Sequence, residues 1–144
     1  MNLNKSTRYA LHAALDLALS SDGPVTAGQI ATRHRIPENV VAKVLQQLVR
    51  SGVARGSRGV GGGYRLARSP ADVSVQELIE IFEPRPSPDT CMLRDLPGDA
   101  CLDATGPGCR LMGLFQEVDE TMRATFASVT LATLAASKHR TRIS

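Results

Sequence analysis

No run of apolar residues in this 144-residue chain is long enough to cross a membrane. The amphipathic, charge-containing start of the chain also lacks the uninterrupted apolar stretch and cleavage site of a secretory signal peptide. We therefore expect a cytoplasmic protein without a membrane partner. A chain of this length forms one domain, or one domain with a dimerising arm, and its core needs no disulfide bonds.

Cysteine is absent from most of the chain. The three that occur, Cys91, Cys101 and Cys109, lie in one stretch rich in Pro, Gly and Asp. Because cytoplasmic thiols stay largely reduced, an odd number of cysteines favours metal ligation or redox sensing over a disulfide framework.

The motifs of a nucleotide-binding or catalytic protein are also missing. Gly61-Gly62-Gly63 runs into Tyr64 and an expected strand, whereas a Walker loop ends in Lys and Ser or Thr at the start of a helix. No arrangement of a nucleophile with a base stands out either. We therefore do not expect an enzyme.

The net charge of +3 conceals a basic and an acidic half. Residues 1–70 contain ten Lys and Arg against three acidic residues, a net +7, whereas residues 71–144 carry a net −4. A polyanionic partner for the first half would explain this asymmetry, and an unevenly charged solvated surface is the alternative.

Apolar residues at helical spacing predict three helices within residues 3–52. The first covers residues 3–20. The second begins with a capping box formed by Thr26 and Gln29, and it stops near His34-Arg35. The third begins at Pro37, which suits a first helical turn, and ends at Ser51-Gly52. The tight joint between the second and third helices is typical of a helix-turn-helix.

After Gly52 the apolar pattern alternates, which predicts strands at 53–57 and 64–68. The glycines between them supply the positive φ angles that a narrow hairpin tip requires. A hairpin directly after a helix-turn-helix is a wing, and a capping box of Ser74 and Glu77 begins a further helix within 69–83. The expected fold is mostly α with a small β-hairpin (α+β), and residues 1–83 form a winged helix-turn-helix DNA-binding domain.

The start of the third helix is the candidate recognition element for double-stranded DNA. In the major groove Glu38 would accept from cytosine and Asn39 would read adenine, with Lys43 one turn further on. Arg58 at the wing tip suits a narrow, electronegative minor groove. Three more basic residues are candidate phosphate ligands: Arg55, Arg65 and Arg8. For each of these basic side chains, the alternative is an ordinary charge exposed on the surface.

Residues 84–110, the cysteine segment, hold five of the eight prolines and show no periodicity. The pattern C-x9-C-x7-C differs from zinc sites, which usually contain pairs of ligands two to four residues apart. The wider spacing favours an iron–sulfur cluster, 2Fe–2S or 4Fe–4S. A thiol switch without metal and small packing residues are the alternatives.

A cluster usually has four ligands, and the cysteine segment offers three thiolates. Asp95, Asp99 and Asp103 are possible oxygen donors in the same segment. His12 in the first helix is a candidate from outside it, although a lone helical histidine is more often a surface residue. A weak or open fourth position would make the cluster labile, which suits a sensor.

The apolar stripe from Leu111 to Val129 predicts a dimerisation helix over residues 111–137. The stripe is too long for a small domain to cover, so we expect a homodimer that presents two wings to a palindromic operator. The alternative is a helix that folds back on its own domain. Residues 138–144 form a basic tail.

Three segments resemble the Rrf2 family of bacterial winged helix-turn-helix regulators, with its IscR-, NsrR- and RirA-like members. They are Thr7 to Leu11, Leu45 to Val53, and the wing sequence from Arg58 to Leu66. The resemblance covers nearly the whole chain and implies a homodimer in which a cluster held by three loop cysteines controls DNA binding. Cys91, Cys101 and Cys109 align with those ligands, and His12 matches a ligand position of some members.

Two classes of function remain. The first is a DNA-binding transcriptional regulator, expected to be a repressor, that senses redox state, nitric oxide or iron through the cluster. The second is a cluster-free regulator gated by cysteine oxidation or by a partner protein.

Overall fold

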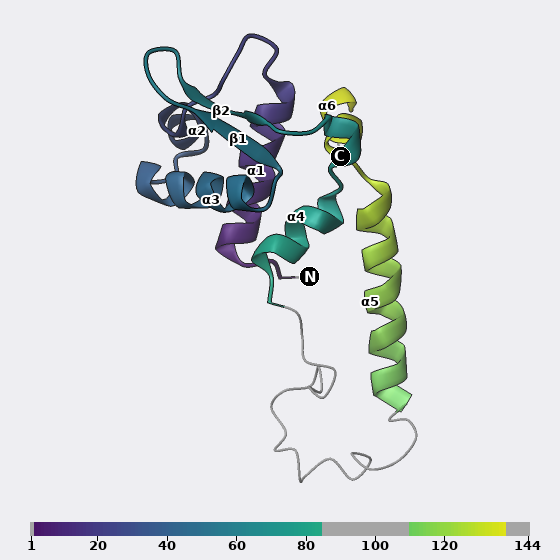
Figure 1. Cartoon of the computed structure of the whole chain (residues 1–144). Helices are drawn as coiled ribbons and strands as arrows, with labels where there is room; N and C mark the ends of the chain where they lie inside the picture. The colour runs from purple at the N-terminus through teal and green to yellow at the C-terminus, as the bar shows by residue number, and fades with distance from the viewer. Residues whose placement is uncertain (1, 85–109, 138–144) are drawn as a thin grey trace, which may run out of the picture.

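The computed structural model describes residues 2–84 and 110–137 (Figure 1). The elements that it contains, in chain order, are α1 (Lys5–Leu19), α2 (Ala27–His34), α3 (Glu38–Arg50), β1 (Ala54–Ser57), β2 (Gly63–Leu66), the 3-10 turn η1 (Pro70–Asp72), α4 (Val75–Phe82), α5 (Arg110–Ser128) and α6 (Leu131–Ala136). The mostly helical fold with one antiparallel hairpin is the expected winged helix-turn-helix.

The helix starts follow the capping chemistry of the sequence. Asn4 caps α1 by accepting from the Thr7 amide at 2.8 Å. The predicted capping box of α2 is confirmed: the Gln29 amide donates to Thr26 Oγ1 at 3.1 Å, and the Thr26 amide donates to Gln29 Oε1 at 2.9 Å. Arg35 ends α2 in the left-handed region with φ 55°, which turns the chain sharply toward Pro37 and α3.

The core lies where α1, α3 and α4 meet. The side of α1 that faces it carries Ala10, Ala13 and Ala14, all buried, so the other helices approach its backbone closely. Leu45 and Leu48 of α3 fill the space opposite and have no exposed surface. Full burial of one such leucine contributes about 1.5–3 kcal/mol to folding, so this small-to-large packing fixes the orientation of α3.

The wing is an antiparallel hairpin paired from Ala54↔Leu66 to Ser57↔Gly63. Its strand limits agree with the predicted ones to within two residues, and β1 ends at Ser57 as predicted. A second attachment holds the hairpin against the helices, because the Val25 amide donates to Tyr64 O at 2.9 Å and the Tyr64 amide donates to Val25 O at 2.8 Å. Gly63 must lack a side chain there, since its Cβ would lie 2.8 Å from Val25 O.

The capping box predicted for α4 is only half formed. The Glu77 amide donates to Ser74 Oγ at 3.1 Å, as expected. The Glu77 carboxylate does not return to the Ser74 amide and instead pairs with Arg68, which follows the wing. This residue therefore ties α4 to the wing rather than closing its own cap.

The segment predicted as one helix over 111–137 contains two helices. The chain leaves helical geometry at Val129, and Thr130 caps α6 by accepting from the Thr133 amide at 3.2 Å. Backbone bonds then attach this bend to the domain, from Val75 N to Val129 O and from Leu131 N to Val73 O, both at 2.9 Å. Leu131 is fully buried in the same core as Leu45 and Leu48.

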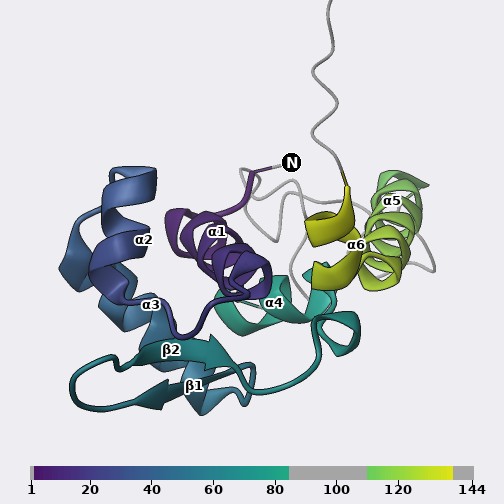
Figure 2. The same ribbon diagram turned by 90° about the horizontal axis from the view of Figure 1, so that it is seen from above.

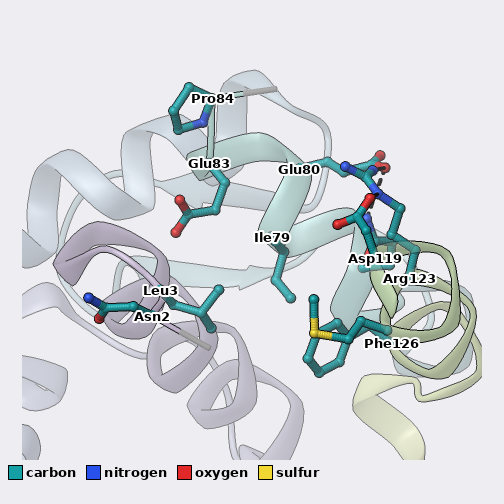
Figure 3. Close-up of a pocket in the computed structure, with 11 residues that line it drawn as sticks. Asn2, Leu3, Ile79, Glu80, Glu83, Pro84, Asp119, Arg123 and Phe126 are labelled. Atoms are coloured by element: carbon teal, nitrogen blue, oxygen red, sulfur yellow. Dashed lines mark hydrogen bonds and ion pairs between the residues drawn. The ribbon is translucent and has the colours of Figure 1, made fainter. Parts of the chain in front are cut away.

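Helix α5 stands at the edge of the molecule, on the side away from α2 and the wing (Figure 2). It is joined to α4 through Arg123, which binds Glu80 at 3.5 Å and Asp119 at 2.7 Å. The hydrogen bond to Asp119 raises the pKa of Arg123 above its ordinary value, and the guanidinium is in any case charged at neutral pH. A pocket of about 180 Å³ lies beside this ion-pair group, between Leu3, Ile79 and Phe126 (Figure 3).

Candidate nucleic-acid interface

Helix α3 presents a polar stripe on the face opposite its buried leucines. Val41, Val44, Leu45 and Leu48 point into the core. The stripe is made of residues spaced by four, three and four positions, which places them on one side of the helix, and all are exposed: Asn39, Lys43, Gln46 and Arg50. The sequence analysis identified the first two, and extending the same spacing would have found Gln46 and Arg50.

Glu38 lies apart from this stripe. A Cβ added to Gly28, in the first turn of α2, would lie 3.6 Å from the carboxylate atoms of Glu38. The acid therefore sits beside the positive end of α2, where a carboxylate is stabilised by unpaired amides. The structure brings Asn39 and Lys43 together and leaves Glu38 turned toward α2.

Arg58 lies at the wing tip and is exposed. The tip is narrow because Gly59 and Gly61 take φ values of 96° and 76°, which favour glycine. Gly62 has no room for a side chain, since its Cβ would lie 2.5 Å from Ser57 O. The arginine therefore projects from a thin loop, as the sequence predicted.

Arg55 and Arg65 are directly opposite each other in the hairpin, and both are exposed. Like charges at paired positions of a sheet oppose folding. A polyanion that neutralises both removes this cost, so the pair favours a phosphate-facing role for this side of the wing. The guanidinium of Arg65 reaches toward Gly23 in the turn between α1 and α2.

Arg8 and His12 do not lie on the α3–wing surface. They occupy successive turns of α1 and line an apolar groove of about 440 Å³ between α1 and the second half of α5, together with Leu11, Leu15, Val75, Thr125, Phe126, Val129 and Leu134. Arg8 is therefore separated from the other candidate phosphate ligands.

The helix-turn-helix and its wing can now be compared with known proteins. A family model described as an iron-dependent transcriptional regulator, Rrf2, matches residues 3–137. The chain belongs to the Rrf2 family.

Relatives with curated names extend over most of this Rrf2 protein. BadM of Rhodopseudomonas palustris, named as an HTH-type transcriptional regulator, is 38% identical over 134 residues, which are 93% of this chain and 81% of BadM. The HTH-type transcriptional regulator IscR of Yersinia enterocolitica is 30% identical over 137 residues, 93% of this chain and 79% of IscR. The Rrf2 protein is thus a DNA-binding transcriptional regulator and not an enzyme.

Solved structures have the same fold. The IscR structure from T. potens gives a TM-score of 0.74 at 24% identity and covers 93% of this chain and 85% of its own. CymR, described as the global cysteine regulator of B. subtilis, gives 0.75 at 23% identity and covers 94% and 96%. At these identities the likeness supports the winged-helix architecture alone.

In the Rrf2 protein a buried carboxylate joins α1 to α2. Asp16 is 5% exposed, and its two oxygens bind Arg33 Nη1 at 3.2 Å and His34 Nε2 at 2.8 Å. The His34 ring also packs on His12, with ring centroids 4.7 Å apart. Through this ion pair Arg33 helps to hold α2 against α1.

The last turn of α4, directly before the cysteine segment, is bonded to two helices of the DNA-binding domain. Glu83 Oε1 accepts from the Asn4 amide at 2.8 Å and from the hydroxyl of buried Thr7 at 2.6 Å. Gln47 of α3 donates to Ile81 O at 2.9 Å. A displacement of this turn would therefore reach α1 and α3 together.

Cys91, Cys101, Cys109 and the candidate donors Asp95, Asp99 and Asp103 lie outside the described residues. Among residues 2–84 and 110–137, no group of three His, Cys, Asp or Glu side chains is placed to hold a metal ion. In those same ranges, no helix has both the length and the apolar character needed to cross a bilayer.

Proposed function

We propose that this Rrf2 protein is a homodimeric repressor whose binding to a palindromic operator is controlled by an iron–sulfur cluster on Cys91, Cys101 and Cys109. Three thiolates on one segment fit the preference of iron–sulfur clusters for cysteine sulfur. When bound, the cluster would supply a redox-sensitive centre that orders the segment carrying its ligands.

The observation that carries this proposal is the last turn of α4. The cysteine segment leaves the domain at Pro84, one residue after Glu83. Glu83 holds the first turn of α1, and Ile81 holds Gln47 on the helix that carries the polar stripe. A change in the cysteine segment therefore has a short physical route to the DNA-binding surface.

The homodimer is supported by an uncovered apolar face on α5. Leu111, Leu114 and Val118 are 52%, 54% and 47% exposed. They share one side of the helix, at spacings of three and four residues. The apolar groove beside Leu11 and Leu15 lies at the other end of the same helix. Two α5 helices that pair antiparallel about a two-fold axis would seat the exposed face of each copy in the groove of the other.

This arrangement also assigns a role to His12. Within one chain His12 lies near Phe126, about 24 Å along α5 from Arg110 at 1.5 Å per residue. Cys109 directly precedes Arg110, so a cluster near Cys109 is out of reach of its own chain's His12. In the antiparallel pair the start of α5 from one copy lies at the groove of the other, and we infer that His12 supplies the fourth ligand across the dimer.

Anaerobic isolation of the full-length protein tests the function. The expected result is a coloured dimer with iron, sulfide and cysteine-dependent absorption, which binds an operator selected from random duplexes with an affinity that changes when the cluster is removed. Cys101→Ser should lose the cluster and keep the dimer, while a control variant in the same segment, Ser87→Ala, keeps both. A colourless, metal-free dimer that binds the operator equally well before and after thiol alkylation contradicts the proposal, and a colourless dimer that responds to oxidant supports the cluster-free alternative.

A further inference from the structure

We propose that the groove between α3 and the wing holds the sugar–phosphate strand that separates the major groove from the adjacent minor groove, with Arg50 binding one phosphate of that strand. This α3–wing groove is lined by Gln46, Val49, Arg50, Gly56, Ser57, Arg58, Gly63 and Tyr64. The inference rests on the proposed operator interface and is independent of the cluster.

The shape of the molecule requires such a strand. A recognition helix reads base edges in the major groove, and an arginine on a thin loop fits the minor groove. Neighbouring major and minor grooves of a duplex are divided by one sugar–phosphate backbone. If Asn39 and Arg58 each enter their groove, that backbone must pass between α3 and the wing, where the structure has a groove of about 410 Å³.

The chemistry of the lining fits a phosphodiester. Its charged residues are both arginines, Arg50 from the last turn of α3 and Arg58 from the wing tip, and no acid lines it. Gln46 and Ser57 add neutral hydrogen-bond donors on opposite walls. Arg50 completes the polar stripe that begins at Asn39, so a single helix face leads from the base edges to the phosphate strand.

The groove is held open by the fold. The two backbone bonds between Val25 and Tyr64 fix β2, and the hairpin pairing fixes β1 against it. Tyr64 packs over Gly56, whose added Cβ would lie 3.6 Å from the Tyr64 ring. Because neither wall has to be ordered on binding, a phosphate contact here costs little conformational entropy. The same contact fixes the position of the protein along the duplex relative to its major and minor grooves.

Neutral phosphate substitutions test this contact. A set of operators would each carry one methylphosphonate, and binding would be measured for wild type and Arg50→Gln. The wild type should lose about tenfold or more in affinity at one position, as for a hydrogen bond to a charged group. That position should lie between the major-groove site of Asn39 and the minor-groove site of Arg58, and Arg50→Gln should be insensitive to the same substitution.

Two further variants separate the possible failures. Arg50→Lys keeps a cation and should keep the salt dependence of binding, whereas Arg50→Gln should lower its slope by about one per bound subunit. Lys5→Gln removes a charge from the far end of α1 and should change neither result. If each methylphosphonate weakens operator binding by the same factor in Arg50→Gln as in wild type, the two losses are independent at every position. That result would overturn the inference. Wild-type binding that shows no salt dependence would instead reject the operator interface itself.

Discussion

The hydroxyl of Thr7 donates a hydrogen bond to the carboxylate of Glu83 at 2.6 Å, and the two residues are separated by 76 positions. Thr7 is fully buried in the first turn of α1, and Glu83 directly precedes the cysteine segment. This contact joins the start of the DNA-binding domain to the start of the proposed sensor.

Removing the Glu83 charge should weaken that connection. Glu83→Gln is expected to lower the free energy of unfolding by about 1–2 kcal/mol, because two donors lose a charged acceptor. In Glu83→Gln the operator affinities of the cluster-loaded and cluster-free protein should become more alike, so that their ratio moves toward one. Glu117→Gln, which changes an exposed acid of α5 in the same way, is the control. An unaltered ratio in a folded, cluster-loaded Glu83→Gln dimer would remove the last turn of α4 from the mechanism.

The wing tip should contribute electrostatically to operator binding. Arg58→Ala is expected to weaken binding and to lower the slope of log affinity against log salt by about one per subunit. Lys5→Ala serves as the control, since Lys5 lies at the opposite end of α1 from the wing. Binding isotherms at several salt concentrations measure both quantities. Identical slopes for wild type and Arg58→Ala would mean that the wing tip does not touch DNA.

Leu131 should behave as a core residue of the DNA-binding domain. Leu131→Ala is expected to lower the free energy of unfolding by about 2–5 kcal/mol, the usual cost of an internal cavity. Leu19→Ala is the matched control, because Leu19 is 53% exposed. Urea denaturation of both variants provides the comparison, and equal small effects would argue that α6 is only loosely attached.

The exposed face of α5 should hold the dimer together. Leu114→Glu buries a charge in the proposed interface and is expected to give a monomer at micromolar concentration. Leu19→Glu, at a position of similar exposure on α1, should leave the dimer intact. Sedimentation equilibrium distinguishes the two states. A stable Leu114→Glu dimer would place the interface elsewhere.

Mixed dimers should reveal whether His12 acts across the interface. His12→Ala and Cys109→Ser homodimers are each expected to lack a complete ligand set. A heterodimer of the two variants would regain one complete site. That site combines the three intact cysteines of the His12→Ala chain with the intact His12 of the Cys109→Ser chain. Iron content and absorption of anaerobically reconstituted mixtures report this rescue. If mixing restores nothing, the fourth ligand is not His12 of a second copy.

Local chemistry made the helices and the wing predictable. The Thr26–Gln29 capping box and the glycines of the hairpin act within a few residues and are found as expected, and Pro37 lies at the N-cap of α3, so that this helix begins one residue after the predicted start. The polar stripe was only partly recognised. Gln46 and Arg50 continue the spacing of Asn39 and Lys43, but nothing local distinguishes them from ordinary solvent-facing residues.

Other features depend on contacts between distant residues. Asp16 falls within a helical pattern as an exposed acid would, and only the packing of α2 against α1 buries it beside Arg33 and His34. The break at Val129 escaped prediction because that residue continues the apolar stripe of α5. Thr130 was the available signal, since its hydroxyl can cap a new helix three residues before Thr133.

The return of α6 to the core has a consequence for protein synthesis. The N-terminal part of the chain emerges from the ribosome first. A nascent polypeptide that lacks Leu131 has an incomplete hydrophobic core around α1 and α4. Residues 91 to 109 are always translated before that leucine. A fragment from premature termination that lacks the cysteines therefore also lacks Leu131 and a complete core, so unregulated occupation of the operator by incomplete products is disfavoured.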